Sequence, residues 1–312
     1  MATTRINDTN SGRSRTVAFR AMRNPQLIIG FGMIGGMAFA AAVLPHLLGL
    51  DPQAVDPLNR LKAPSLAHFL GTDNFGRDLA ARILAGASTS LRLAASVTLL
   101  AAAIGVAVGI LASFSRLLDH VLMRICDGLM AIPALLLALA LTATFGPKFS
   151  NLLIALVIVF VPGIARLVRA RALALRSETF VEAAVAMGAS DLHIMARHIF
   201  PNVLSILAVQ VTFLFAETIV IEAALSFLGA GVPPPAPSWG NILYDGKAAI
   251  AKAPYMVLFA STAMVMTVVG LTLIGDGLRD LVDPRSGPQP EASWSKRLLR
   301  LVLPCTKEGE RE

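Results

Sequence analysis

Residues 179–201, TFVEAAVAMGASDLHIMARHIFP, form a polar, helix-forming insert between two segments, about 149–165 and 203–225, that are apolar enough to lie in lipid. Polar and charged side chains are costly inside a bilayer. The insert is therefore expected to lie in water at one face of a membrane. The rest of the chain is expected to alternate between membrane spans and aqueous segments.

The composition excludes an ordinary soluble domain. Hydrophobic residues make up 55 % of the 312 positions and charged residues 15 %, and the mean hydropathy is +0.68. A bilayer core needs about 17 to 25 apolar residues per helix. These properties predict an all-α integral membrane protein with six transmembrane helices. The six apolar segments are approximately 27–50, 93–114, 127–145, 149–165, 203–225 and 255–275.

The distribution of positive charge predicts the orientation. Nineteen of the 27 Lys and Arg residues lie on the side of the N-terminus, the 115–126 and 166–202 segments and the C-terminal tail. Positively charged loops of membrane proteins face the cytoplasm, so both termini and the insert are predicted to be cytoplasmic. This asymmetry and contact with anionic membrane lipid explain the net charge of +7. No nucleic-acid partner is therefore predicted.

The chain divides into four predicted parts. Residues 1–24 form a polar cytoplasmic leader. Residues 25–92 contain an outer loop and the first membrane helix, an uncleaved anchor that is too long for a signal peptide. Residues 93–285 form a five-helix core with the polar loop 177–201. The tail 286–312 combines apolar residues at helical spacing with several prolines, so a surface-lying helix and disorder both remain open.

The sequence predicts a non-catalytic chain. It contains no G-x-x-x-x-G-K-[ST] nucleotide-binding loop, since Gly246-Lys247 is followed by Ala248. Cys126 and Cys305 are far apart and indicate neither a disulfide nor a metal site. We therefore expect this chain to bind no cofactor and no metal. Any ATP hydrolysis that drives it would belong to a partner chain.

Two features of the apolar segments predict how the helices pack. Ala101, Gly105 and Gly109 place small residues on one face of the second span, where a neighbouring helix can approach closely. Pro133 and Pro162 interrupt the third and fourth spans, and proline removes a backbone hydrogen bond and kinks a helix. Such kinks either shape a translocation path or are simple structural bends.

The fifth span contains two glutamates, Glu217 and Glu222. Ionisable groups in a membrane segment usually face a cavity or a partner. Glu222 is close to the outer end of the span, where we expect it to reach the interface. Glu217 lies deeper, and two roles remain open for it: a place on a transport pathway or between subunits, and a structural hydrogen bond.

The insert carries its own helix signals. Thr179 followed by Glu182 predicts a capping box at the start of a short helix. Gly188 is suited to end that helix, and Ser190 is predicted to cap a second helix that runs toward Pro201. We expect two short helices with a glycine elbow, whose exposed apolar face docks into a groove on another protein. A helix lying on the lipid surface is the alternative.

These residues resemble the EAA loop of ABC importer permeases, which reads Glu-Ala-Ala, three residues, Gly, nine residues and then Ile-x-Leu-Pro. His198 and Phe200 occupy the places of the Ile and the Leu, and a His-Ile-x-Pro ending is familiar in the peptide-importer branch. The resemblance implies that the loop docks on an ATPase subunit and couples it to the permease. The implied coupling residues are Thr179, Glu182, Ala183, Ala184, Gly188, His198 and Pro201.

Three further segments resemble the C-type permease subunit of dipeptide, oligopeptide and nickel importers. They are GTDNFGRD at 71–78, SFLG at 226–229 with the Pro-rich segment that follows to 241, and GDGLRD at 275–280. With the insert, the resemblance covers about residues 20–285. The implied outer-face residues are Gly71, Thr72, Asp73, Gly76, Arg77, Asp78 and Trp239.

The outer motifs can also be interpreted from their residues. The glycines of 71–78 permit tight turns, and its Asp and Arg residues can pair across the segment, which predicts a folded cap on the outer surface. This cap either contacts a ligand or only stabilises its own loop. Trp239 follows a stiff Pro-rich segment and could anchor at the membrane interface or contact a docked partner. The resemblance favours the partner, because the family's binding protein docks on this side.

The resemblance implies a function and a set of partners. The chain would be a permease subunit of a bacterial cytoplasmic (inner) membrane, in a heterodimer with a homologous second permease and with two ATPase subunits that use ATP and Mg. An extracytoplasmic solute-binding protein would deliver di- or oligopeptides. An importer of nickel or another small solute is the alternative within the family. An ion-coupled secondary carrier is disfavoured, because Glu217 is the only deep ionisable group and no clear repeat is present.

Overall fold

The computed structural model describes residues 24–282. The predicted leader, apart from Asn24, and the predicted tail 286–312 lie outside the described residues. The regular secondary structure of the described part is helical, apart from one isolated β-bridge between Thr72 and Asp78. Its elements are α2 (Pro25–Leu47), η1 (Pro57–Asn59), α3 (Leu79–Phe114), α4 (Arg116–Met130), α5 (Ala134–Phe145), α6 (Phe149–Arg176), α7 (Thr179–Ala186), α8 (Asp191–Ile194), η2 (Met195–Ile199), α9 (Phe200–Phe227), α10 (Trp239–Ala248) and α11 (Pro254–Val282).

Five helices are long and apolar enough to cross a membrane: α2, α3, α6, α11 and the continuous stretch Asp191–Phe227 that contains α9. The pair α4 and α5 is a sixth candidate, with a bend of 92° at a short break. Pro133 lies at this break, where proline cannot continue the preceding helix, so the predicted interruption of the third span is present. Pro162 instead lies within the unbroken helix α6.

Several predicted spans have different ends in the structure. α3 begins at Leu79 rather than near residue 93, so the predicted division at 92 falls inside a helix. α6 continues to Arg176, and residues 116–126, predicted as part of a loop, belong to α4. The helices continue through the charged residues at which the predicted spans end, because a helix satisfies its own backbone hydrogen bonds in lipid and in water alike.

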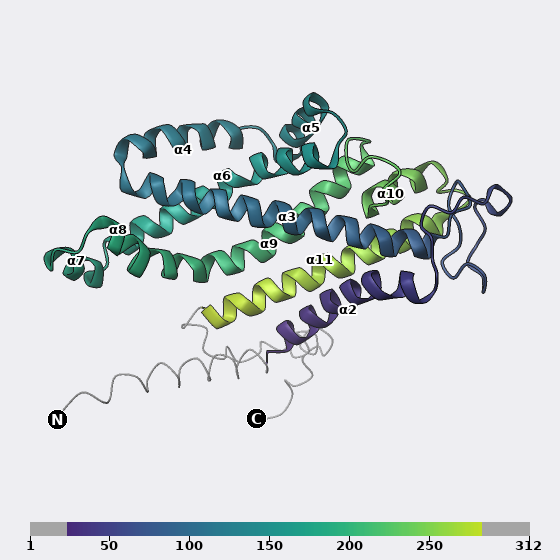
Figure 1. The fold of residues 1–312 in the computed structure, drawn as a ribbon, viewed down its shortest axis with the longest axis horizontal. Helices are drawn as coiled ribbons and strands as arrows, with labels where there is room; N and C mark the ends of the chain where they lie inside the picture. Colours follow the sequence, from purple (N-terminus) through teal and green to yellow (C-terminus); the bar gives the residue numbers. More distant parts are fainter. Residues whose placement is uncertain (1–23, 283–312) are drawn as a thin grey trace, which may run out of the picture.

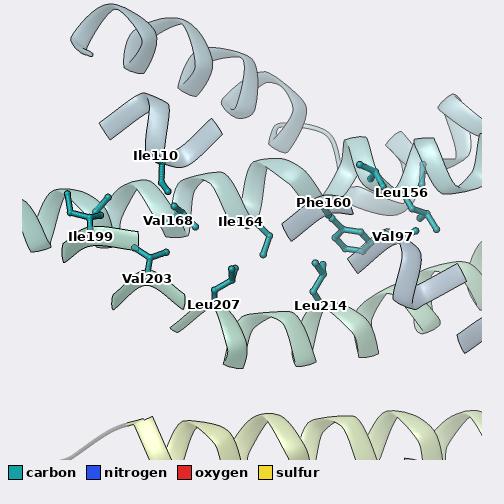
Figure 2. Close-up of a cluster of buried hydrophobic side chains, with 14 of the residues drawn as sticks. Val97, Ile110, Leu156, Phe160, Ile164, Val168, Ile199, Val203, Leu207 and Leu214 are labelled. Atoms are coloured by element: carbon teal, nitrogen blue, oxygen red, sulfur yellow. The ribbon is translucent and has the colours of Figure 1, made fainter. Parts of the chain in front are cut away.

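The long helices lie side by side, with α7 and α8 at one end of the bundle and α10 at the other (Figure 1). We refer to these as the α7 end and the α10 end. A buried core joins α3, α6 and α9 along the bundle (Figure 2). It includes Ile110 of α3, Ile164 and Val168 of α6, and Val203 and Leu207 of α9.

The predicted small-residue face of α3 packs against α6. Ala101 is fully buried. A Cβ atom at Gly105 would lie 2.6 Å from the Cβ of Ile164, and one at Gly109 would lie 2.5 Å from the carbonyl oxygen of Ala165. Both positions therefore need glycine for the helices to approach this closely. The prediction of close packing within the bundle is confirmed.

Candidate functional site

The predicted coupling loop forms a fixed element at the α7 end. α7 spans Thr179–Ala186, and its Val181 and Ala184 are buried in the core that joins α3, α6 and α9. Glu182 and Ala183 are exposed on the other side of the same helix. One face of α7 is therefore attached to the bundle, while the opposite face is accessible to a partner.

Gly188 ends α7 in a Schellman motif. Its N–H donates to the carbonyl oxygen of Val185 (2.9 Å), and the next N–H donates to that of Ala184 (3.1 Å). Gly188 has φ +81°, a left-handed conformation that glycine adopts at the lowest cost. Ser190 then caps α8 by accepting a hydrogen bond from the His193 N–H (3.4 Å). The predicted capping roles of Gly188 and Ser190 are confirmed.

Two predictions about this loop are wrong. The N-cap residue of α7 is Glu178, not Thr179, and no side chain makes a cap hydrogen bond, because Thr179 is already helical and the cap position lies outside the helix. The second helix is not separate, since α8 continues through the π-helical turn η2 into α9. Pro201 lies in the first turn of α9, directly after η2. The glycine elbow is therefore attached directly to a membrane span.

Arg176 connects this loop to two other helix ends. Its Nη1 donates to the carbonyl oxygen of Ser113 at the end of α3 (2.6 Å), and its Nη2 lies 4.0 Å from an Asp191 carboxylate oxygen at the start of α8. The ring of His198, which is partly buried, lies 5.9 Å from that of Phe180 on α7. The loop is therefore in contact with the end of α3, the start of α8 and the π-helical turn η2.

A buried carboxylate organises the segment 71–78 at the α10 end. Asp73 is 1 % exposed, and its Oδ1 accepts hydrogen bonds from the N–H groups of Phe75 (2.8 Å) and Arg77 (2.9 Å). Its Oδ2 accepts from Arg77 Nε (2.7 Å) and Arg82 Nη1 (2.6 Å). The predicted pairing of Asp with Arg is present. We call residues 71–78 the Asp73 cap.

The other residues of the motif are also used within the Asp73 cap. Gly71 and Gly76 have φ +84° and +77°, and a Cβ atom at Gly76 would lie 1.8 Å from a neighbouring carbonyl oxygen. Thr72 Oγ1 accepts from the Lys62 N–H (2.9 Å), and Asp78 Oδ1 accepts from an N–H in the first turn of α3 (2.9 Å). These bonds favour a stabilising role for the motif over direct contact with a ligand.

Arg82 and Asp245 complete the network, although the sequence reading did not single them out. Arg82 is 3 % exposed, and its Nη2 lies 3.4 Å from Asp245 Oδ2. Arg77 Nη2 lies 3.6 Å from the same oxygen. Burial raises the pKa of the Asp245 carboxyl above its ordinary value, and the nearby Arg77 acts in the opposite direction. Arg82 follows the motif closely. Asp245 lies 163 positions after Arg82, and no sequence pattern indicates that the two residues meet.

Trp239 and Glu222 are core residues, so the interfacial role predicted for Glu222 is wrong, and the Trp239 side chain neither anchors at the membrane interface nor is accessible to a docked partner. Trp239 is fully buried, and its Nε1 donates to the carbonyl oxygen of Ile83 (3.2 Å). Glu222 is 1 % exposed and accepts hydrogen bonds from Ser90 Oγ (3.1 Å) and Ser226 Oγ (2.7 Å). A carboxyl group that is removed from water needs such partners. Both side chains join α3 to the segments that follow it much later in the sequence.

A cavity of about 260 Å³ lies in the middle of the bundle. Its walls come from the break between α4 and α5, including Pro133, from α6, including Gly163, and from α9. Gln210 and Glu217 of α9 supply its polar side chains. Glu217 is exposed, and its carboxyl group makes no hydrogen bond within residues 24–282, so the structural role predicted as one alternative has no partner in this part of the chain. We call this space the Glu217 cavity.

A second cavity of about 490 Å³ lies at the α10 end. The Pro-rich segment 232–236, Phe75 and Tyr244 form much of its wall, and Arg77 and Arg82 also line it. It shares no lining residue with the Glu217 cavity. The two cavities are therefore separate sites, one in the middle of the helices and one at the end that carries the Asp73 cap.

The apolar helices, the central cavity and the anchored polar elbow are those of a multi-pass transport protein. Residues 101–287 match the family described as binding-protein-dependent transport system inner membrane component. The chain belongs to this family, which comprises permease subunits of ABC importers, and it is a multi-pass protein of the bacterial inner membrane.

Similar proteins agree with this assignment. A putative peptide transport system permease protein of Brucella abortus is 45 % identical over 276 residues, which cover 88 % of this chain and 93 % of that protein. The dipeptide transport system permease protein of Alkalihalophilus pseudofirmus is 40 % identical over 270 residues, 86 % of this chain and 89 % of that one. A solved chain of the MetNI methionine ABC transporter shares the fold, with a TM-score of 0.55 and 21 % identity over 64 % of this chain and 96 % of that chain.

Proposed function

We propose that this chain is one of two related permease subunits whose heterodimer forms the path for di- or oligopeptides delivered by an extracytoplasmic binding protein. The names of the peptide and dipeptide permeases to which it is similar support this substrate class. The Glu217 cavity supports a path through the middle of the helices, with a carboxylate and an amide in its wall. The second permease would complete that path.

The α7 end faces the cytosol and docks on one of two ATPase subunits, which bind and hydrolyse ATP with Mg. Val185, Met187 and Leu192 are exposed there by 58, 81 and 70 %, and an exposed apolar face on a fixed element is suited to a groove on a partner. The distribution of Lys and Arg supports the same orientation. Both termini are then cytosolic, and this chain itself binds no cofactor.

The anchored elbow is the observation that carries this proposal. α7 is attached to the core through Val181 and Ala184, and beyond Gly188 the chain enters α8, which is continuous with α9. The same α9 carries Glu217 in the wall of the central cavity. Movement of the ATPase subunits against α7 can therefore reach the substrate path through one continuous helix.

Reconstitution of the complete complex in liposomes tests the proposed function. We expect ATP-dependent peptide uptake only when this chain, the second permease, the ATPase subunits and the loaded binding protein are all present. Mass spectrometry of the ligand that copurifies with the binding protein identifies the peptide. Uptake without ATP would contradict the proposal in favour of an ion-coupled carrier, and ATP-dependent uptake of nickel but of no peptide would contradict the substrate class.

Glu217→Gln is expected to slow peptide uptake roughly tenfold, equivalent to about 1.4 kcal/mol of activation free energy. The substitution removes the charge from the cavity wall while keeping the size of the side chain, so assembly of the complex should be unchanged. Initial uptake rates in the reconstituted complex provide the measurement. Asp51→Asn, at an exposed position of the loop that precedes α3, is the matched control. Wild-type uptake in the Glu217 variant would exclude a role in the path.

A further inference from the structure

A charged groove of about 360 Å³ lies between α4 and α6, which pack side by side (Figure 1). Two ion pairs cross it. Arg166 Nη2 lies 2.5 Å from Asp127 Oδ1. The Arg169 guanidinium binds both carboxylate oxygens of Asp119, with Nη2 at 2.6 Å from Oδ2. We call this space the α4–α6 groove. All four residues lie at or beyond the ends of the predicted spans, and the sequence predicts no role for them.

The two ion pairs are accessible from the groove. The side chains of Arg166 and Asp127 are 50 % and 55 % exposed, and those of Arg169 and Asp119 are 30 % and 23 % exposed. Water screens the Arg166–Asp127 pair, which is about half exposed, so its two partners are held together only weakly. A solute with charges of its own can therefore replace either partner of this pair without leaving a buried charge behind. The Arg169–Asp119 pair is less exposed and its guanidinium binds both carboxylate oxygens, so it is the stronger of the two.

The amphipathic pattern of α4 indicates that the groove is wet. Leu117, Val121 and Ile125 follow one another at four-residue intervals and are 74, 51 and 57 % exposed, so they form an apolar side that suits lipid or a neighbouring membrane helix. His120 and Arg124 lie on the side that lines the groove. In a membrane, charged groups border a water-filled space or a partner rather than lipid.

The α4–α6 groove lies along the same helices as the Glu217 cavity, nearer the α7 end, and shares no lining residue with it. On α4, Asp127 lines the groove and Leu129, two residues later, lines the cavity. On α6, Gly163 lines the cavity, and Arg166, about one turn later, lines the groove. Arg169 is a further turn along α6, in the direction of its end at Arg176. The ion pairs therefore form two successive steps between the cavity and the α7 end.

We propose that the α4–α6 groove is the inner part of the substrate path and that its ion pairs bind solutes carrying both a carboxylate and an ammonium group. The proposal rests on the function proposed above. A free carboxylate takes the guanidinium of Arg166 and then that of Arg169, which offer paired N–H donors. A free ammonium takes Asp127 and then Asp119. The two partners of an ion pair separate to bind the carboxylate and the ammonium of one solute, and they pair again when the solute moves on. No charge is therefore left unpaired during passage.

Single charge removals distinguish this role from a structural one. Asp127→Asn leaves Arg166 without its partner, and Arg166→Gln leaves Asp127 without its partner. In the reconstituted wild-type and variant complexes, uptake of the dipeptides Ala-Asp and Ala-Lys is measured with the same binding protein. The Ala-Asp to Ala-Lys uptake ratio of each variant is divided by the same ratio for the wild type. Differences in the affinity of the binding protein for the two peptides then cancel.

We expect the ratio to rise in Asp127→Asn and to fall in Arg166→Gln, each by roughly tenfold, because a cleft lined by one sign of charge concentrates solutes of the opposite sign. Asp51→Asn and Arg92→Gln, at exposed positions outside the groove, should leave it unchanged. If the ion pairs only hold helices or subunits together, a variant should change the uptake of both peptides equally and leave the ratio unchanged. That result would overturn the inference, as would wild-type uptake of both peptides. If the wild-type complex imports neither peptide, the proposed function fails first and this inference fails with it.

Discussion

Asp73→Ala is expected to lower the free energy of unfolding by about 3–5 kcal/mol, because removing one partner from a buried ion pair leaves uncompensated charge. Here the charges left behind are the guanidinium groups of Arg77 and Arg82, which Asp73 Oδ2 holds at 2.7 and 2.6 Å. The Asp245 carboxylate, at 3.6 and 3.4 Å, can balance no more than one of these two charges. Two backbone N–H groups also lose the acceptor that Oδ1 provides. Thermal denaturation of the purified complex in detergent should therefore show a clearly lower melting temperature.

Asp51→Ala is the matched control for this effect. Asp51 precedes the same cap and is exposed, and its side chain accepts one hydrogen bond, from the Gln53 N–H (2.8 Å). Its removal should change the free energy of unfolding by no more than about 0.5 kcal/mol. Asp73→Asn keeps one carbonyl oxygen as an acceptor and should be intermediate in stability. Equal melting temperatures for Asp73→Ala and Asp51→Ala would show that the network does not hold the α10 end together.

Gly188→Leu is expected to abolish the ATP hydrolysis that the loaded binding protein stimulates, while the chain remains inserted in the membrane. Gly188 has φ +81°, and a left-handed conformation costs a residue with a side chain about 1–2 kcal/mol. A Cβ atom at this position would meet no other atom within 4 Å. The strain therefore falls on the elbow itself and changes the angle at which α7 faces the ATPase. ATPase assays on the reconstituted complex, with copurification of the ATPase subunits, measure the effect.

Gly188→Asn separates backbone strain from loss of the glycine. Asparagine tolerates the left-handed conformation better than leucine, so this variant should retain most of the stimulated hydrolysis. Glu182→Ala tests the exposed face of α7 without altering its backbone, and we expect it to weaken association with the ATPase subunits. Normal stimulation in both Gly188→Leu and Glu182→Ala would contradict the docking role of this element.

Features that depend on neighbouring residues could be predicted from the sequence. The small-residue face at Gly105 and Gly109, the break at Pro133 and the helix end at Gly188 all occur as expected. Each depends on sterics or backbone hydrogen bonding within a few residues, which operate in any fold. The capping role of Thr179 was wrong, because Thr179 already lies inside the helix and no side chain caps α7.

The role of α4 could not be predicted in this way. Uninterrupted apolar segments end where charged residues begin, so residues 116–126 were predicted as a loop and the fourth span was predicted to end before Arg166. Amphipathic periodicity could have identified the helix, since Leu117, Val121 and Ile125 recur every four residues. No local signal, however, could show that Asp119 and Asp127 meet Arg169 and Arg166, because 50 and 39 positions separate the partners.

The sequence by itself determined the membrane class, the approximate number of spans, the glycine elbow and the family, because apolar length, backbone sterics and ordered motifs are properties of the chain before it folds. Only the tertiary structure decided which polar groups are buried and which are accessible. It placed Trp239 and Glu222 in the core, closed the Asp73 cap with Asp245, and left Glu217 without a partner within residues 24–282. The physical reason is that desolvation depends on neighbours from distant segments, whose approach is set by the packing of the whole bundle.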